Sequence, residues 1–210
     1  MWDNATGSAA TICNAEAFKN GNIKPKRSII FINYTAEEVG LVGSEYFAKS
    51  NLLKDRSVVA NINIDMLRSI HKTTELTPEG YNHSTLKESV GFAIEAMNMT
   101  INDPTQLEEQ YICRSDQMSF IKIGVPTLNI GSGLKSENSY RNIMELLMNW
   151  QKTSYHTPFD DRDQYFETKA FHDSLKLNFL VTYFSANESD EIKWNKEGWL
   201  YKRYVCNWFE

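Results

Sequence analysis

Cysteine is scarce in this sequence. The 210 residues contain three cysteines, Cys13, Cys113 and Cys206, which are far apart and form no CxxC pair. Metal sites built on cysteine usually bring such pairs together, so the sequence gives no sign of a cysteine-ligated metal. We interpret the three residues as small buried apolar side chains or free thiols.

Long hydrophobic runs and a basic excess are also missing. No apolar run approaches the roughly 20 residues needed to cross a bilayer, and no charged-then-apolar leader is visible. The 22 Lys and Arg residues are outnumbered by 27 Asp and Glu residues, for a net charge of -5. Binding to nucleic acid normally needs clustered basic residues. We therefore expect neither a membrane-spanning segment nor a nucleic-acid partner.

What is present is enough for one sizeable core. Hydrophobic residues make up 41% of the chain and aromatic residues 12%, and a chain of this length can bury them in one domain. We expect a single domain over residues 1–210 with an aromatic tail from about residue 187. Tails of this kind most often pack against a core; its aromatic residues are Trp194, Trp199, Tyr201, Tyr204, Trp208 and Phe209.

Two predicted strands end in carboxylates. The β-branched and aromatic run 28–34 is followed by Glu37 and Glu38, and the run 58–65 ends in Asp65. Such runs are typical of buried strands. Leaving acids unpaired at the end of a buried strand is costly unless a cation or hydrogen bonds compensate them. Ligands of open α/β sheets bind at this position, so we expect a functional site there.

Helices and further strands alternate with these runs, which predicts an α/β protein. A helix is expected after Asp3, where local sequence also allows Asp3 to be its N-cap. We predict a loop over 76–83 and a short strand over 111–113. Apolar residues at helical spacing predict helices near 39–51, 84–97, 115–120, 136–150 and 166–186, and a turn and strand cover 124–131.

The candidate metal ligands are oxygen and imidazole donors without cysteine. Asp3, Glu38 and Asp65 lie at a helix start or at strand ends, and His156 lies in a predicted loop. This donor set suits a catalytic zinc or a similar divalent ion. An isolated loop histidine is usually an ordinary surface residue, and the sequence leaves His71, His83 and His172 without a role.

Five motifs, in order and across nearly the whole chain, resemble the co-catalytic dizinc aminopeptidases. That family is typified by bacterial leucyl aminopeptidase and includes glutamate carboxypeptidase II, the transferrin receptor ectodomain and glutaminyl cyclase. The motifs are DNATGSA at 3–9, AEEVGLVGS at 36–44, NIDM at 63–66, RSDQ at 114–117 with Phe120 and GVP at 124–126, and YHTPFD at 155–160.

The resemblance implies a zinc-dependent aminopeptidase acting on peptides. Asp3 would bridge two zinc ions, Glu38 and His156 would complete one site, and Asp65 would bind the other. Glu37 would be the general base. The resemblance also implies that Asp160 orients His156 and that Asp116 supports the site. The implied fold is a three-layer α/β/α sandwich with a mixed, largely parallel sheet, and the implied location is secreted or periplasmic.

One expected ligand is missing. The family supplies a further histidine from a His-x-Asp segment that precedes the bridging aspartate, and these 210 residues begin after it. We therefore expect an N-terminally incomplete chain that lacks the first strands of the sheet, leaves an exposed edge and binds one zinc well and the second poorly. A non-catalytic binding module and a single-zinc glutaminyl cyclase are the alternatives.

Overall fold

A computed structural model describes residues 1–205 apart from residues 23, 54–55, 68, 73, 103–109 and 134–142. Its sheet has four strands in the order β1-β4-β2-β3. β1 pairs with β4 and β2 pairs with β3 in parallel, whereas β2 and β4 are antiparallel. The strands are β1 (Asn61–Asn63), β2 (Glu75–Glu79), β3 (Thr100–Ile101) and β4 (Thr127–Ser132).

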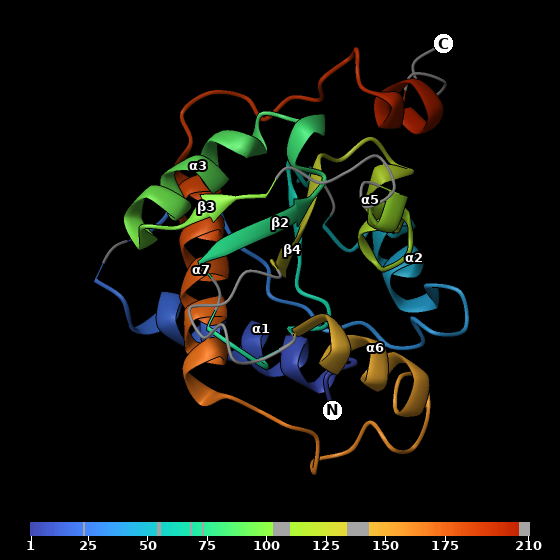
Figure 1. The fold of residues 1–210 in the computed structure, drawn as a ribbon. Helices are drawn as coiled ribbons and strands as arrows, with labels where there is room; N and C mark the ends of the chain where they lie inside the picture. Colours follow the sequence, from blue (N-terminus) through green and yellow to red (C-terminus); the bar gives the residue numbers. More distant parts are fainter. Residues whose placement is uncertain are drawn as a thin grey trace.

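Helices cover both faces of this sheet (Figure 1). α3 and α7 lie against one face together with α1, and α2 and α5 lie on the other, with α6 below them in the view. The predicted α/β sandwich with a mixed, largely parallel sheet is confirmed. The helices are α1 (Ala5–Asn20), α2 (Val42–Lys49), α3 (Leu86–Met97), α5 (Gln117–Ile121), α6 (Ile143–Thr153) and α7 (Thr168–Asn187), with short helical turns η1 (Tyr81–His83), η2 (Gln110–Cys113) and η3 (Tyr201–Val205).

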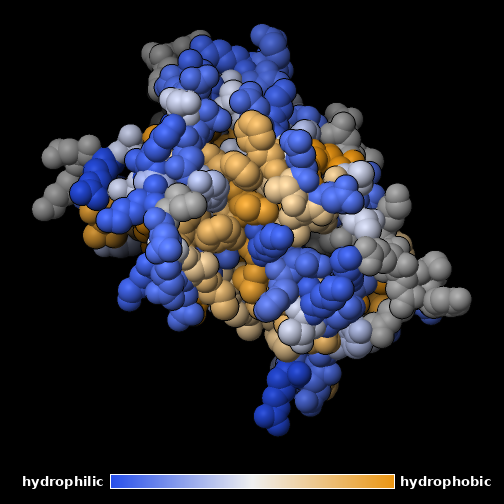
Figure 2. Space-filling view, turned by 90° about the vertical axis from the view of Figure 1, so that its left-hand side faces the viewer, coloured by the Kyte–Doolittle hydropathy of each residue, from blue (hydrophilic) through white to orange (hydrophobic). Residues whose placement is uncertain are grey.

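The main core lies between the sheet and the α3–α7 layer. Alternate residues of β2 and β4, such as Leu76, Leu128 and Ile130, face this layer, and Val90 and Val181 meet them from the helices. All five are buried, at 1% exposure or less. The outer side of the same layer is partly apolar (Figure 2). There Phe92 is 50% exposed and its ring lies 5.4 Å from that of Phe184.

The segment 28–34 departs from its prediction. It is extended but belongs to no strand in the described sheet, and only residues 61–63 of the predicted 58–65 strand pair with β4. A β-branched run favours extended backbone, but a strand exists only where a neighbour supplies its hydrogen bonds. The segment 28–34 lacks such a neighbour among the described residues.

Two shorter elements were also assigned wrongly. β2 (residues 75–79) overlaps the predicted loop 76–83, and the helical turn η2 (residues 110–113) covers the predicted strand 111–113. Pro78 is tolerated in β2 because β3 pairs with Glu75 and Leu76 alone, so among the described residues no strand lies beside the proline on that edge of β2. β3 follows shortly after Asn98, and residues 103–109 lie outside the described part.

The aromatic tail packs against the α5 side of the molecule. Trp194 donates its indole N–H to the carbonyl of Gly124 at 2.7 Å, and Leu200 is fully buried beside Ile112 and Ile121. These contacts agree with the interpretation of the tail as a packing segment; Trp208 and Phe209 lie outside the described residues. None of the described helices is long and apolar enough to cross a bilayer.

Candidate metal centre

Asp3 is held at the start of α1, but it does not cap the helix. Asn4 is the N-cap: its Oδ1 accepts the N–H of Gly7 at 3.0 Å and that of Met66 at 3.1 Å, and its Nδ2 donates to the carbonyl of Ile64 at 3.2 Å. The capping interpretation of Asp3 was therefore wrong. Asn4 ties the helix start to the end of β1, and the Asp3 carboxylate is left to make other contacts.

Close packing of α1 against the β1 end depends on a glycine. A Cβ on Gly7 would collide with the carbonyl oxygen of Ile64. Because glycine has none, the first turn of α1 approaches the strand closely enough for Asn4 to bond both Ile64 and Met66.

A tight turn presents Glu37 and Glu38. Ala36 and Leu41 both have φ of 60°, and the carbonyl of Glu37 accepts the N–H groups of Gly40 and Leu41. The chain therefore turns sharply between the extended segment 28–34 and α2, which begins at Val42 and not at the predicted Val39. Glu37 is half-buried whereas Glu38 is exposed, so the two glutamates take different environments.

Asp65 lies two residues after the end of β1. The Asn129 side chain of β4 accepts the Asp65 N–H at 3.4 Å, and its amide group donates to Glu79 Oε2 at 3.0 Å. Asn129 is 8% exposed, so it is a buried link between the end of β1 and the neighbouring strands. No sequence pattern indicates this role, because the link exists only once β4 lies beside β1.

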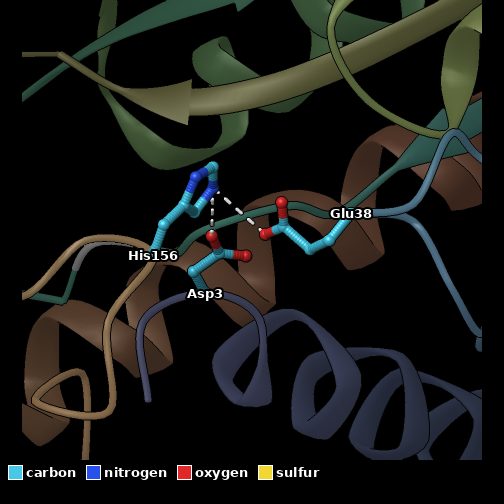
Figure 3. A group of neighbouring side chains, drawn as sticks. All are labelled: Asp3, Glu38 and His156. Carbon is cyan, nitrogen blue, oxygen red and sulfur yellow. Dashed lines mark ion pairs between the residues drawn. The ribbon is translucent and has the colours of Figure 1, made fainter.

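Three of the four predicted ligands meet in space (Figure 3). His156 Nε2 lies 3.3 Å from Asp3 Oδ2 and 3.1 Å from Glu38 Oε1. The ligand atoms of the three residues lie within 4.8 Å of one another. In Figure 3 they converge from the start of α1, the turn before α2 and the loop after α6. We call Asp3, Glu38 and His156 the ligand triad.

The triad fits a divalent cation. Two carboxylates and one imidazole are a usual zinc donor set, and three protein ligands leave a coordination position open in catalytic sites. Bonds of about 2 Å to each donor require ligand atoms about 3–3.5 Å apart, and the two measured separations lie in that range. Exposure of 48% for His156 and 56% for Glu38 also leaves the group open to solvent.

The His156 loop is fixed from both sides. The Tyr155 ring lies 3.7 Å, centroid to centroid, from the imidazole, and Tyr155 itself packs on Trp150 at 4.9 Å. His156 has φ of 57°, and Thr157 closes the turn by donating its N–H to Ser154. Tyr155 is therefore a supporting residue that sequence reasoning missed, although it stands next to the predicted ligand.

Burial and mutual repulsion raise the pKa values of two acids. Burial, followed by the nearby Asp65 and Glu38, raises the pKa of Asp3 to about 6, although His156 lowers it. Burial, followed by Asp65 and Glu38, raises the pKa of Glu37 to about 7. The negative charges of Asp65 and Glu38 thus disfavour the ionisation of both Asp3 and Glu37. A bound cation would relieve that repulsion.

Asp160 holds the backbone of the N-terminal segment. Its carboxylate accepts the N–H groups of Trp2 at 3.1 Å and Asp3 at 2.9 Å, and the indole N–H of Trp150 at 3.2 Å. Burial alone would raise the pKa of Asp160, but hydrogen bonds from the terminal ammonium, Asp3 and Trp150 hold it below its ordinary value. These bonds position Asp3, whereas the sequence predicted that Asp160 would orient His156.

Asp116 lies beside the site and does not bond the triad directly. Burial raises its pKa, the Ser44 hydroxyl lowers it, and Asp65 raises it further. Ser44 is fully buried and lies 2.8 Å from the Ser119 hydroxyl of α5. The carboxylate therefore adds negative charge near Glu37 and Asp65, and its role as a supporting residue stays a prediction.

The raised pKa values predict that the metal-free protein loses stability as pH rises. The Glu37 carboxyl has a pKa of about 7 in the folded protein and an ordinary value of 4.5. Between these two pH values the folded state binds more protons than the unfolded state, so stability falls as pH rises. After allowance for solvent screening, we expect about 1 kcal/mol, or 2–4 °C in Tm, between pH 5.5 and 7.5. Saturating zinc should remove the loss.

The control for this prediction is Glu37→Gln. Burial lowers the pKa of His71, which makes stability rise with pH and so opposes the effect of Glu37. Both proteins contain His71. The quantity to compare is therefore the Tm difference between wild type and Glu37→Gln at each pH. As pH rises, Tm of wild type should fall relative to Tm of Glu37→Gln. A difference that is the same at both pH values would contradict the assignment.

The matching family model and the related proteins are all peptidases or peptide-inactivating enzymes. The sequence model of peptidase family M28 matches residues 1–182. Leupeptin-inactivating enzyme 1 of Streptomyces exfoliatus is 26% identical over an alignment of 187 residues that covers 85% of this chain and 40% of that protein. Aminopeptidase NAALADL1 of Mus musculus is 29% identical over an alignment of 160 residues that covers 69% of this chain and 21% of that protein.

Solved structures show the same fold. A zinc aminopeptidase of Bacillus subtilis superposes with a TM-score of 0.59 at 21% identity, covering 94% of this chain and 43% of that one. The LapA aminopeptidase of Legionella pneumophila superposes with a TM-score of 0.63 at 20% identity, covering 90% of this chain and 47% of that one. The chain thus spans less than half the length of each of these relatives.

Proposed function

The chain belongs to peptidase family M28, and on that premise we propose that the protein is a zinc-dependent aminopeptidase that hydrolyses the N-terminal peptide bond of peptides. The observation that carries the proposal is the ligand triad, in which His156 Nε2 lies 3.3 Å from Asp3 and 3.1 Å from Glu38. Two relatives, an aminopeptidase and a leupeptin-inactivating enzyme, support the same class of reaction.

Asp3, Glu38 and His156 would hold one zinc ion, and Asp3 together with Asp65 would contribute to a second. The contribution of Asp65 to the raised pKa of Asp3 supports this pairing, because it places the two carboxylates near each other. When bound, zinc polarises a carbonyl group and lowers the pKa of water towards about 7.

Glu37 is the proposed general base. Its carboxylate is not part of the ligand triad, but the other acids of the site are close enough to raise its pKa to about 7. A base with a pKa near the working pH both accepts and returns a proton efficiently. Glu37 would take a proton from the attacking water and deliver it to the departing amine, which becomes the new N-terminus of the shortened peptide.

The acidic surroundings favour substrates with a free amino group. Asp3, Glu37, Glu38, Asp65 and Asp116 all line one cavity. Their combined negative charge attracts the ammonium group of a peptide N-terminus. Binding that group near the ligand triad would place the first peptide bond, and no later one, beside Glu37.

An assay with an aminoacyl chromogenic substrate tests the function. The zinc-loaded protein should release the chromophore from leucine p-nitroanilide, a chelator should stop the release, and added zinc should restore it. The N-acetylated substrate should not be cleaved, because it lacks the ammonium group. Turnover that survives chelation, equal cleavage of the acetylated substrate, or no turnover by zinc-loaded protein would each contradict the proposal.

A further inference from the structure

Five Asn-x-Ser/Thr triplets, or sequons, occur in the chain, and the structure separates them by their surroundings. They begin at Asn4, Asn33, Asn82, Asn98 and Asn187. A sequon is the acceptor for an N-linked oligosaccharide, but the triplet alone is frequent by chance. A folded protein can carry a bulky oligosaccharide only where the asparagine side chain reaches solvent without giving up contacts of the fold.

Two of the sequons lie beside the metal centre. The Asn4 side chain caps α1 and bonds both Ile64 and Met66, and Asn33 lines the cavity of about 810 Å³ that Glu37 also lines. A sugar on Asn4 would push α1 away from the end of β1, and a sugar on Asn33 would enter the cavity. Neither position suits an oligosaccharide in the folded protein.

Two further sequons are held by neighbouring segments of the chain. Asn187 uses both atoms of its amide, since Nδ2 donates to the carbonyl of Tyr183 at 2.8 Å and Oδ1 accepts the N–H of Lys26 at 3.2 Å. The carbonyl of Asn82 accepts the Asn195 side chain at 3.2 Å, where the tail returns to the core. A sugar at either position would compete with these contacts.

Asn98 differs from the other four because backbone groups alone close the helix that it ends. It follows α3 directly, and its N–H bonds the carbonyl of Glu95 at 3.1 Å. The N–H of Met99 then bonds the carbonyl of Ile94 at 2.9 Å. These bonds do not involve the side-chain amide of Asn98, and the residue is exposed.

The residue types of this sequon also suit an acceptor. Asn98 has φ of 52° and ψ of 47°, a conformation in which glycine is commonest because it has no Cβ. Asparagine is tolerated there, but it adds a side chain that the helix end does not need. Thr100, the hydroxyl residue of the sequon, is also exposed and begins β3. Both residues that define the sequon therefore lie at the surface.

The sequon stands at an edge of the sheet. β3 is the last strand in the order β1-β4-β2-β3, and no described strand lies beyond it. Thr100 and Asn102 donate their N–H groups towards β2, to the carbonyls of Thr74 and Leu76. Because backbone groups alternate sides along a parallel strand, the N–H of Ile101 points outward. Such an edge can pair with another chain unless something blocks it.

We propose that Asn98 carries an N-linked oligosaccharide that shields the β3 edge. The donor is a lipid-linked oligosaccharide diphosphate, so the proposal includes passage through a secretory pathway that supplies it. The Asn98 side-chain nitrogen attacks the anomeric carbon of the sugar and forms a C–N bond. The bond from that carbon to the diphosphate oxygen breaks, the lipid diphosphate leaves with the electron pair, and the amide nitrogen loses one proton. The sugar is bulky and solubilising.

The proposed glycan lies away from the metal centre. The sheet order places β3 three strands from β1, near whose end Asp65 lies. At a strand spacing of about 4.8 Å, β3 is about 14 Å from β1. In Figure 1 the end of α3 and β3 likewise lie on the opposite side of the sheet from α2. The glycan and the peptidase activity can therefore be tested separately.

Site mapping tests the acceptor. The full chain is secreted from cultured eukaryotic cells behind a cleavable signal peptide, and the folded monomer is treated with peptide N-glycosidase in ¹⁸O water, which converts each glycosylated Asn to labelled Asp. Mass spectrometry should find the label at Asn98 in most molecules. Unmodified Asn98 in the folded monomer would overturn the proposal. A label at Asn4 or Asn33 in that monomer would overturn the structural selection of Asn98.

Translation in the presence of microsomes decides the question if too little protein is secreted. Asn98→Gln and Thr100→Val should each remove one glycan-sized step of gel mobility, because each destroys the same sequon. Asn102→Gln is the matched control: it makes the same chemical change four residues away, outside any sequon, and should change nothing. Wild-type mobility in both Asn98→Gln and Thr100→Val would overturn the proposal.

A pair of substitutions at one residue tests the shielding. Thr100→Val and Thr100→Lys both abolish the sequon, but a lysine on an exposed edge strand opposes pairing with another chain. In sedimentation at rising concentration, Thr100→Val should form at least about threefold more oligomer than glycosylated wild type, whereas Thr100→Lys should stay monomeric. Equal monomer content in Thr100→Val and wild type would overturn the shielding role.

Discussion

Replacing Glu37 with Gln is expected to lower kcat by about 10²–10⁴-fold, the usual contribution of a general acid–base group, while zinc affinity stays within about threefold of wild type. Gln has the same shape but can neither accept nor return the proton. Because Glu37 lies outside the ligand triad, the donors that hold the metal remain. Steady-state kinetics at saturating zinc and zinc titration of the same preparations measure the two quantities separately.

Glu45→Gln is the matched control for this change. Glu45 lies on α2, forms an ion pair with Lys49 and is part of neither the metal centre nor the cavity lining. Its replacement makes the same chemical change eight residues away, and kcat should stay within about twofold. If Glu37→Gln kept more than a tenth of wild-type kcat, the general-base role would be excluded, and if zinc affinity fell in parallel, Glu37 would be a ligand.

The second large effect concerns the ligands themselves. His156→Ala and Glu38→Ala should each weaken zinc binding by at least roughly 100-fold, because losing even a group that only supports a ligand costs 10–100-fold. Each change removes one of three donors that lie within 4.8 Å of one another. Competition against a fluorescent zinc chelator gives the affinities, and zinc-induced stabilisation in thermal unfolding gives an independent measure.

His172→Ala controls for the histidine change. His172 is an exposed residue of α7 outside the ligand triad, and its replacement should leave zinc affinity unchanged. Circular dichroism of all variants in chelator establishes that the fold is retained. Undiminished zinc binding in both Glu38→Ala and His156→Ala would refute the ligand assignment.

Much of the metal centre could be predicted from the sequence because each ligand carries local information. Glu38 follows a β-branched run, Asp65 ends another, and His156 stands in the motif YHTPFD. Apolar periodicity likewise located α3 and α7, since long amphipathic patterns depend on few distant contacts. Motif order then indicated that residues from both ends of the chain belong to one site.

Other assignments failed where the outcome depended on a distant partner. Residues 28–34 have the composition of a strand, yet no described strand pairs with them. Asp3 and Asn4 are equally good caps by local sequence, and the choice of Asn4 follows from its bonds to Ile64 and Met66, about sixty residues away. The bonds of Asp160 to Trp2 and Asp3 likewise join opposite ends of the chain.

By itself, the sequence determined which chemical groups are available: carboxylates and an imidazole without cysteine, at the ends of apolar runs that favour an α/β fold. Only the tertiary structure decided which groups meet. The turn that carries Glu37 and Glu38 is closed by bonds from Gly40 and Leu41 to the Glu37 carbonyl, and the Tyr155 ring fixes the His156 loop. Contacts between residues far apart in sequence set these geometries, and local propensity carries no information about such contacts.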